Sequence, residues 1–445
     1  MDITLTSVRS PYSAAWLKLG VFSLIAAGLF SLLLVLSRTP GAQDVIPWID
    51  FFHTALVVHV NLSVLIWFMS FSCLFWSLYA GSSSLWLEKI ALTLCIVGTL
   101  VLVVAPFLGA DKPLLNNYIP VLQHPLFFWS IALFTLGVLI QCLRVLVSVP
   151  DWNDVSRLAP YIAAVFTLSS IIALVVTWAN LPAEIESLVY YEYLFWGAGH
   201  ILQFSHTCLL LLSWLVLLSY LGGKLPVSAS SLKWLFLILL LPMAYALYIY
   251  TAYEVFSPEH ITAFTDLMKF GGLASLPLGL LVAWVFIRTG LNSTDATKAV
   301  KAALLSSFIL FAAGGVIGFL IHGVNVVIPA HYHGSIVGVT LAFMGVAYYL
   351  LPTLGYRVPV SKTAHLQPYV YGGGQLMHIL GLAWSGGYGV QRKTAGTAQG
   401  LDSLPEVVGM GMMGLGGLIS IIGGVMFLVV MLRSMWPYTP KTSSN

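Results

Sequence analysis

The histidines are the residues of this chain best suited to hold a metal or a metal-bearing cofactor. There are eleven of them in 445 residues, against only four cysteines, and neutral imidazole is the commonest metal ligand in proteins. The sharpest group is His331-Tyr332-His333. Residues two apart on a helix point about 200° away from each other. One helix bearing this group could therefore hold one iron on each of its two sides.

The segments that carry these histidines read as membrane helices. Charged residues make up 8% of the chain and hydrophobic residues 59%, whereas an ordinary soluble domain carries about 25% charged residues. Crossing a bilayer takes about 20 mostly apolar residues. The sequence predicts one all-α integral membrane domain over residues 1–445. We expect a bundle of twelve transmembrane helices at 14–37, 51–80, 86–109, 125–148, 157–181, 190–221, 232–253, 264–288, 298–323, 331–352, 367–388 and 405–436.

Charge and cysteine patterns exclude several classes of protein and predict an orientation. A net charge of +3 is too small to indicate nucleic acid as a partner. The four cysteines form no Cys-x-x-Cys motif, so we expect no disulfide frame, zinc site or covalently attached heme. Most Lys and Arg residues fall on the side that holds both termini, which the positive-inside rule makes cytoplasmic. We expect no buried Asp or Glu in the inner half of the bundle, with Glu88 at the edge of an inner loop.

Six histidines fall at one depth, the outer third of the predicted membrane. Polar residues inside a membrane are costly, and they usually mark a function. Six imidazoles at one level, from several helices, therefore favour a metal or heme layer over six unrelated core residues. The six are His59, His200, His260, His322, His331 and His333.

The chain resembles the catalytic subunit of the heme-copper oxidase superfamily, which includes cytochrome oxidases and bacterial nitric oxide reductases. The resemblance rests on the twelve spans, on His59-Val60-Asn61 near the outer end of span 2, and on the His-x-His at the start of span 10. It implies two hemes. His59 and His333 would be the axial ligands of a low-spin heme, and His331 would be the proximal ligand of a high-spin heme with one open face.

Two further segments are similar to the family. Span 6 reads Trp196-Gly197-Ala198-Gly199-His200, like the family segment whose His binds a non-heme metal, iron or copper, facing the open heme. The exit of span 11 is similar to a segment whose basic pair holds the heme propionates, which implies that role for Arg392 and Lys393. Cations at an otherwise acidic outer face need anionic partners, and propionates supply them. His322 resembles a family His near the propionates.

Two departures from the family concern the non-heme metal. Many oxidases carry a Tyr four residues after the span 6 His, where this chain has Phe204, and nitric oxide reductases lack that Tyr too. The two adjacent histidines that the family has at the outer end of span 7 are also absent. The stretch offers Glu254 instead, and His260 in the loop that follows. Either these two join His200 as ligands, or no second metal binds.

The sequence therefore predicts a membrane-bound respiratory oxidoreductase that reduces a small diatomic gas. Reduction of nitric oxide to nitrous oxide is the leading hypothesis, with His200, His331 and Glu254 as the catalytic residues. The alternatives are an oxygen-reducing cytochrome oxidase and a non-catalytic heme relay or sensor. We expect the bacterial inner membrane, with both termini cytoplasmic. We also expect an electron-donating partner subunit with heme c or a dicopper centre on the outer face.

Overall fold

The computed structural model describes residues 3–5, 10–37, 51–148, 150–182, 184–392 and 401–436. It separates into two compact units, Met1–Gly290 (unit 1) and Leu291–Asn445 (unit 2). Each unit is described by itself below. The single domain expected over residues 1–445 stays a prediction.

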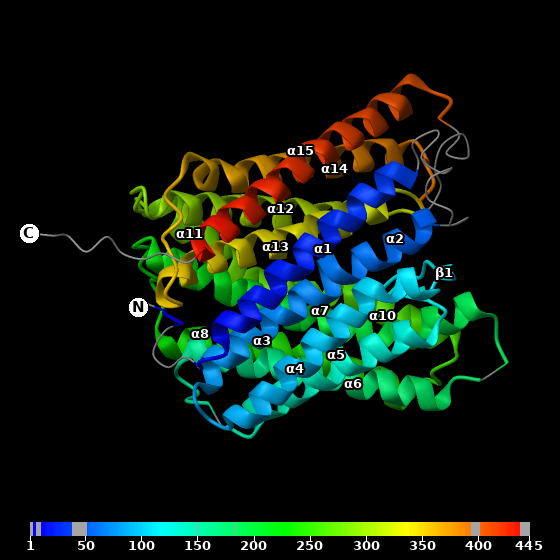
Figure 1. Cartoon of the computed structure of the whole chain (residues 1–445), viewed down its shortest axis with the longest axis horizontal. Coiled ribbons are helices and arrows are strands. Elements are labelled where there is room, and N and C mark those ends of the chain that lie inside the picture. The colour runs from blue at the N-terminus through cyan, green and yellow to red at the C-terminus, as the bar shows by residue number, and fades with distance from the viewer. Residues whose placement is uncertain are drawn as a thin grey trace, which may run out of the picture. The chain divides into compact units, whose positions relative to one another are not determined.

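Unit 1 is built from helices and one short hairpin (Figure 1). Its elements in chain order are α1 (Ser13–Ser37), α2 (Phe51–Val60), the π-helix η1 (Asn61–Ile66), α3 (Trp67–Ala80), α4 (Leu85–Val104), the 3-10 helix η2 (Ala105–Leu108), β1 (Pro113–Leu114), β2 (Val121–Leu122), α5 (Pro125–Leu146), α6 (Val155–Asn180), α7 (Ser187–Tyr220), α8 (Ala229–Leu237), η3 (Ile238–Leu240), α9 (Leu241–Ala252), α10 (Pro258–Gly271), η4 (Gly272–Ser275) and α11 (Leu276–Arg288). The antiparallel hairpin pairs Pro113 with Leu122 and Leu114 with Val121.

The described residues of unit 2 form four long helices (Figure 1). They are α12 (Lys298–Phe319), α13 (Val327–Thr353), α14 (Lys362–Gly387) and α15 (Leu404–Met435).

Polar side chains cap the first turn of several helices in both units. The side chain of Ser361 accepts from the Ala364 N–H at 3.1 Å at the start of α14, and Asp154 accepts from the Ser156 N–H at 3.0 Å at the start of α6. Such caps satisfy backbone donors that the first helical turn leaves without partners.

The expected all-α membrane bundle is confirmed. Within the described ranges, eleven helical stretches are long and apolar enough to cross a membrane. Some of these stretches join consecutive elements: α2 continues through η1 into α3, α8 through η3 into α9, and α10 through η4 into α11. The twelfth is α14, which has 26 residues but carries more polar ones, among them His365, Gln367 and His378. All twelve predicted spans thus correspond to helices.

Three predicted boundaries are wrong in ways that move histidines. His260 was expected in a loop, but α10 begins at Pro258 and carries it in its first turn. Ser257 caps that turn, its hydroxyl accepting from the His260 N–H at 3.2 Å. His322 was expected at the end of span 9, but α12 ends at Phe319 and leaves it outside the helix. Conversely, α13 begins at Val327, so the His331-Tyr332-His333 group lies a full turn inside it.

One buried acid contradicts the expectation that the inner half of the bundle has none. Glu88, in the first turn of α4, is fully buried and pairs with Arg144 of α5 at 2.9 Å. The Ser10 hydroxyl and the Trp16 indole N–H donate to the same carboxylate at 2.5 and 3.2 Å. Arg144 also donates to the Gly81 carbonyl at 2.7 Å. Buried charges are tolerated when they are paired and hydrogen-bonded in this way, so we interpret the cluster as structural.

Candidate active site

His200 lies inside unit 1 on α7, fully buried. Its Nδ1 is 2.7 Å from the carbonyl oxygen of Trp196, one turn earlier on the same helix. A carbonyl oxygen only accepts, so Nδ1 carries the proton and Nε2 carries the lone pair. That Nε2 is buried and has no hydrogen-bond partner among the described residues. Fixing Nδ1 on a carbonyl in order to present Nε2 is how metal-ligating histidines are usually held.

His260 is the second imidazole of this region. Its ring is fully buried in the first turn of α10, and neither ring nitrogen has a hydrogen-bond partner within the described ranges. Buried polar atoms without partners are costly and call for an explanation such as a bound ion. The Phe264 ring lies 4.9 Å from the His260 ring and 5.6 Å from the His200 ring. The two imidazoles therefore border one phenyl ring, and the structure brings them together as a candidate pair of metal ligands.

Aromatic rings enclose the pair. The Tyr118 ring, from the loop after β1, is 5.0 Å from His200, and the Tyr250 ring, from α9, is 5.2 Å from His260. Burial and the nearby carboxylate of Glu192 raise the pKa of Tyr118 above its ordinary value, so its phenol stays protonated. The neutral phenol and the apolar rings around the imidazoles shield them from water. This shielding strengthens electrostatic interactions between the imidazoles and any bound ion.

The glycines of the span 6 motif explain how the tyrosines fit. A Cβ on Gly199 would collide with the Tyr118 ring, and one on Gly197 would collide with the Tyr250 hydroxyl. That hydroxyl is 2.9 Å from the Thr177 hydroxyl. Because residues two apart point to nearly opposite sides of a helix, Gly197 and Gly199 clear space on two sides of α7, one for Tyr250 and one for Tyr118. Sequence reasoning used this motif for His200 but missed both tyrosines, which the two glycines could have indicated.

The loop that carries Tyr118 is fastened on two sides. The Asn61 side-chain amide donates to the Pro120 carbonyl at 2.8 Å. On the other side Asn117 donates to Glu192 of α7 through its backbone N–H, at 3.2 Å, and through its side chain. These bonds hold the loop over α7, so the position of Tyr118 against His200 is determined by the fold.

Glu254 does not complete the pair. It lies in the turn between α9 and α10 with its side chain exposed. Among the described residues there is no group of three or more His, Cys, Asp or Glu that could hold a metal ion. Of the expected set His200, His260 and Glu254, the structure thus gathers the two imidazoles alone. Phe204, four residues after His200, stacks on Phe166 at 5.7 Å and brings no hydroxyl.

His59 shows the same presentation of Nε2 elsewhere in unit 1. It lies near the end of α2, and its Nδ1–H donates to the Ala27 carbonyl of α1 at 2.8 Å. The next residues form the π-helical turn η1, in which the backbone is locally widened. Such turns occur often at functional sites. The arrangement suits an axial heme ligand, and this role of His59 stays a prediction.

The histidines of unit 2 cluster on α13 and α14. The Nδ1–H of His331 donates to the Gly314 carbonyl of α12 at 2.7 Å. The absence of a side chain at Gly318 makes room for that ring, because a Cβ there would lie 2.6 Å from Nδ1. The His333 ring is 5.0 Å from the His378 ring of α14. All three rings are half-buried.

The candidate propionate residues lie at the ends of these helices. His322 is exposed in the segment between α12 and α13, and Arg392 is half-buried beyond the end of α14. A backbone bond from Val326 N–H to the Val390 carbonyl, at 3.0 Å, ties the two segments together. Lys393 lies outside the described residues. The roles of all three stay predictions.

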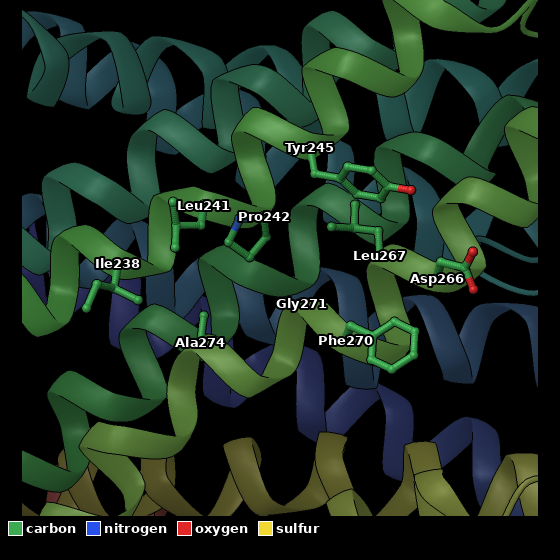
Figure 2. Close-up of a pocket in the computed structure, with 9 residues that line it drawn as sticks. All are labelled: Ile238, Leu241, Pro242, Tyr245, Asp266, Leu267, Phe270, Gly271 and Ala274. Carbon is green, nitrogen blue, oxygen red and sulfur yellow. The ribbon is translucent and has the colours of Figure 1, made fainter.

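A separate groove of about 520 Å³ lies on unit 1. Figure 2 shows its lining, which comes from η3 and α9 on one side and from α10 and η4 on the other. Apart from Tyr245 and Asp266 the lining is apolar. None of the imidazoles lines it, so it is not part of the candidate site.

Comparisons with known proteins give one family match, two relatives and one similar fold. The sequence model of the family described as cytochrome c and quinol oxidase polypeptide I matches residues 13–436. An uncharacterized protein of Rickettsia prowazekii is 31% identical over 98% of each chain. One of Aquifex aeolicus is 27% identical over 80% of this chain and 88% of its own. A solved heme-copper terminal oxidase dimer matches with a TM-score of 0.66 at 17% identity, over 95% of this chain and 85% of that chain; this likeness concerns the fold.

Proposed function

Because the chain belongs to the cytochrome c and quinol oxidase polypeptide I family, whose members are heme-dependent respiratory oxidoreductases, we propose that it reduces nitric oxide to nitrous oxide. The reaction is 2 NO + 2 e⁻ + 2 H⁺ → N₂O + H₂O. In this proposal His59 and His333 would hold a low-spin heme, and His331 would hold a high-spin heme. His200 and His260 would hold a non-heme metal. Hemes bound there would supply electron transfer and a binding site for the gas.

The observation that carries the proposal is the buried imidazole pair of His200 and His260. Three of its four ring nitrogens are buried without hydrogen-bond partners among the residues described. Because a neutral imidazole has one lone-pair nitrogen, the pair would give a first-row transition metal two nitrogen ligands. A metal held by the two imidazoles would supply a binding site for a small gas. The aromatic walls keep bulk water out, while His200 is fixed by its bond to Trp196. The residues present therefore fit a non-heme metal, with iron or copper as the candidates.

The heme ligands follow the resemblance and the presentation of Nε2. We assign His331 to the high-spin heme, because its Nδ1–H is bound to a carbonyl and its Nε2 is left to bind iron. His59, which is held in the same way, is assigned to the low-spin heme, together with His333 from the resemblance. His322, Arg392 and Lys393 would bind the propionates. Glu254 is retained as a proton donor or third ligand that the exposed turn could deliver.

Phe204 favours nitric oxide over oxygen. Many oxidases of the family place a tyrosine hydroxyl at this position, whereas the Phe204 ring packs against Phe166. Purified protein given one reductant should therefore consume nitric oxide and release nitrous oxide, with oxygen uptake much slower. Oxygen uptake without nitric oxide consumption would contradict the proposal and support an oxygen-reducing cytochrome oxidase.

A second candidate function is a non-catalytic heme relay or sensor. It is favoured by the absence, within the described part of the chain, of a three-residue metal cluster. Metal analysis separates the two. Two hemes with one additional iron or copper per chain support the enzyme, and two hemes with no further metal support the relay.

The proposal includes a partner and a membrane. With no electron-accepting group of its own besides hemes, the chain would receive electrons from a subunit that carries heme c or a dicopper centre on the outer face of a bacterial inner membrane. Both termini would be cytoplasmic. Purification from native membranes under mild conditions should retain such a subunit. An active preparation that contains this chain alone would contradict the expectation.

A further inference from the structure

Asn61 ends the His59-Val60-Asn61 motif, of which the proposed function uses only the first residue. It begins the π-helical turn η1, and its side chain is buried, with 1% exposed. The side-chain amide donates to the Val57 carbonyl at 2.9 Å and to the Pro120 carbonyl at 2.8 Å. An amide nitrogen carries two protons. Both are used here, so the orientation of the Asn61 side chain is fixed.

Pro120 belongs to the loop of residues 115–120, which joins β1 to β2. Pairing of Leu114 with Val121 closes this loop at its base. Glu192 of α7 holds another side of the loop, because its carboxylate accepts from the Asn117 N–H at 3.2 Å and from the Asn117 side chain. The loop is therefore fastened both to η1, through Asn61, and to α7.

The fastened loop places Tyr118 against a proposed metal ligand. The Tyr118 ring lies 5.0 Å from the His200 ring, with an angle of 59° between the ring planes. It occupies the space that the missing side chain of Gly199 leaves beside α7. The bond to the Trp196 carbonyl holds one nitrogen of His200, and the packed Tyr118 ring restricts rotation of the imidazole about that bond. Contacts of this kind are what keep a metal ligand in its binding geometry.

We propose that Asn61 is a positioning residue for the metal site of His200 and His260. By holding the 115–120 loop, Asn61 keeps Tyr118 packed on His200 and so fixes the imidazole that binds the metal. The inference rests on the proposed function, because it needs a metal at this pair. The motif then serves both centres, with His59 as a heme ligand and Asn61 as a support for the metal ligand.

The metal affinity of Asn61→Leu tests this directly. The full-length protein is purified with its hemes, stripped of non-heme metal with a chelator, and titrated with Fe²⁺ alone or with Cu²⁺ alone. Leucine has a similar size but donates no hydrogen bond to Pro120, so affinity should fall at least about 10-fold, the lower end for loss of a supporting residue. The low-spin heme spectrum should stay, because His59 keeps its own bond to Ala27. Asn61→Ala, which removes the same donors, is the second variant if the first does not fold.

Ser63→Ala is the matched control in the same π-helical turn. The Ser63 hydroxyl donates to carbonyls of its own helix, and this variant should bind metal as the wild type does. Tyr118→Phe keeps the ring and should also bind normally. Tyr118→Ala removes the ring and Gly199→Ala displaces it, so both should lose affinity as Asn61→Leu does.

Three results would overturn the inference. Wild-type metal affinity in the Asn61 variants would mean that the loop keeps its place without this residue. An equal loss in Ser63→Ala would mean that any change in η1 disturbs the site. A loss in Tyr118→Phe as large as that in Tyr118→Ala would assign the effect to the hydroxyl instead of the packed ring. A wild-type protein that binds neither metal is a different failure, because it would refute the metal site of the proposed function itself.

Discussion

The His200–His260 pair of unit 1 and the imidazoles of unit 2 are held in different surroundings. His200 and His260 are fully buried between aromatic rings, and three of their nitrogens have no partner among the described residues. His331, His333 and His378 are half-buried, and two of them are fastened to carbonyls of neighbouring helices beside glycines. A small ion can be enclosed completely by side chains. A porphyrin is much larger, so the histidines that bind its iron must face an open space. The difference supports a metal ion at the His200–His260 pair and heme ligation by the histidines of unit 2, with His59 of unit 1 held like the latter.

The largest expected effect is loss of the unit 1 metal. His200→Ala removes the fixed imidazole, and we expect gas reduction to fall by at least about 100-fold, because changes to residues that merely support a ligand already cost 10–100-fold. The non-heme metal should disappear while heme content stays. Turnover, metal analysis and the heme spectrum measure this.

His206→Ala is the matched control for that variant. His206 lies on the same helix and its Nδ1 is also buried without a partner within the described ranges, but its ring packs on Phe68 at 4.9 Å. The His206→Ala variant should keep the non-heme metal. Equal metal loss in both variants would mean that the pocket is sensitive to any cavity in α7, and would contradict the assignment of His200.

The next effect concerns how each unit stabilises its buried polar groups. Glu88→Gln leaves the Arg144 guanidinium buried without its countercharge, which costs roughly 3–5 kcal/mol. The apparent Tm in detergent should fall by several degrees. Replacing both residues with apolar ones of similar size should recover much of the loss, because no unpaired charge then remains.

Unit 2 contains a buried hydrogen bond between neutral side chains, to compare with the charged Glu88–Arg144 pair of unit 1. The Tyr348 hydroxyl donates to the Gln367 side-chain oxygen at 2.9 Å. Tyr348→Phe leaves one buried acceptor without its donor, which costs about 1–3 kcal/mol. The loss in Tm should be smaller than that of Glu88→Gln. An equal or larger loss would remove the distinction between a charged cluster in unit 1 and a neutral one in unit 2.

A smaller effect tests the glycine beside His331. In Gly318→Ala the new Cβ would lie 2.6 Å from His331 Nδ1, so the ring must turn away from the Gly314 carbonyl. We expect heme affinity to fall about 10-fold, the lower end for loss of a supporting bond. Gly315→Ala should have no effect, because nothing lies within 4 Å of its Cβ. Heme retention during purification compares the two, and identical retention would contradict the role of Gly318.

The smallest effect is a pH dependence at the loop before α12. The hydrogen bond from Lys298 to Asp295, at 2.7 Å, lowers the pKa of Asp295 below its ordinary value. A lowered carboxyl pKa stabilises the fold above the unfolded-state pKa, and this contribution is lost as pH falls through the folded-state pKa. Both side chains are well exposed, so solvent screens the pair. Wild type and Asp295→Asn should differ slightly in Tm at neutral pH and converge in acid; a difference that grows in acid would contradict the sign.

Much of the fold could be predicted from the sequence because membrane spans are long and apolar. The burial of Glu88 could not, because its partner Arg144 lies on a different helix and a charge in the first turn of α4 reads as a loop edge. His260 was misplaced because Ser257-Pro258 reads as a loop, although it caps a helix. The contact of Tyr118 with His200 and the bond from Asn61 to the Pro120 carbonyl join distant segments, which spacing along the chain does not reveal.

We propose that the histidines of the two units hold two hemes and one non-heme metal. It is tested most directly by determining heme by its pyridine complex, and iron and copper by elemental analysis, per chain of purified protein. We expect two hemes and one further iron or copper per chain, with the further metal absent from His200→Ala. A heme-free chain, or one whose further metal persists without His200, would contradict it.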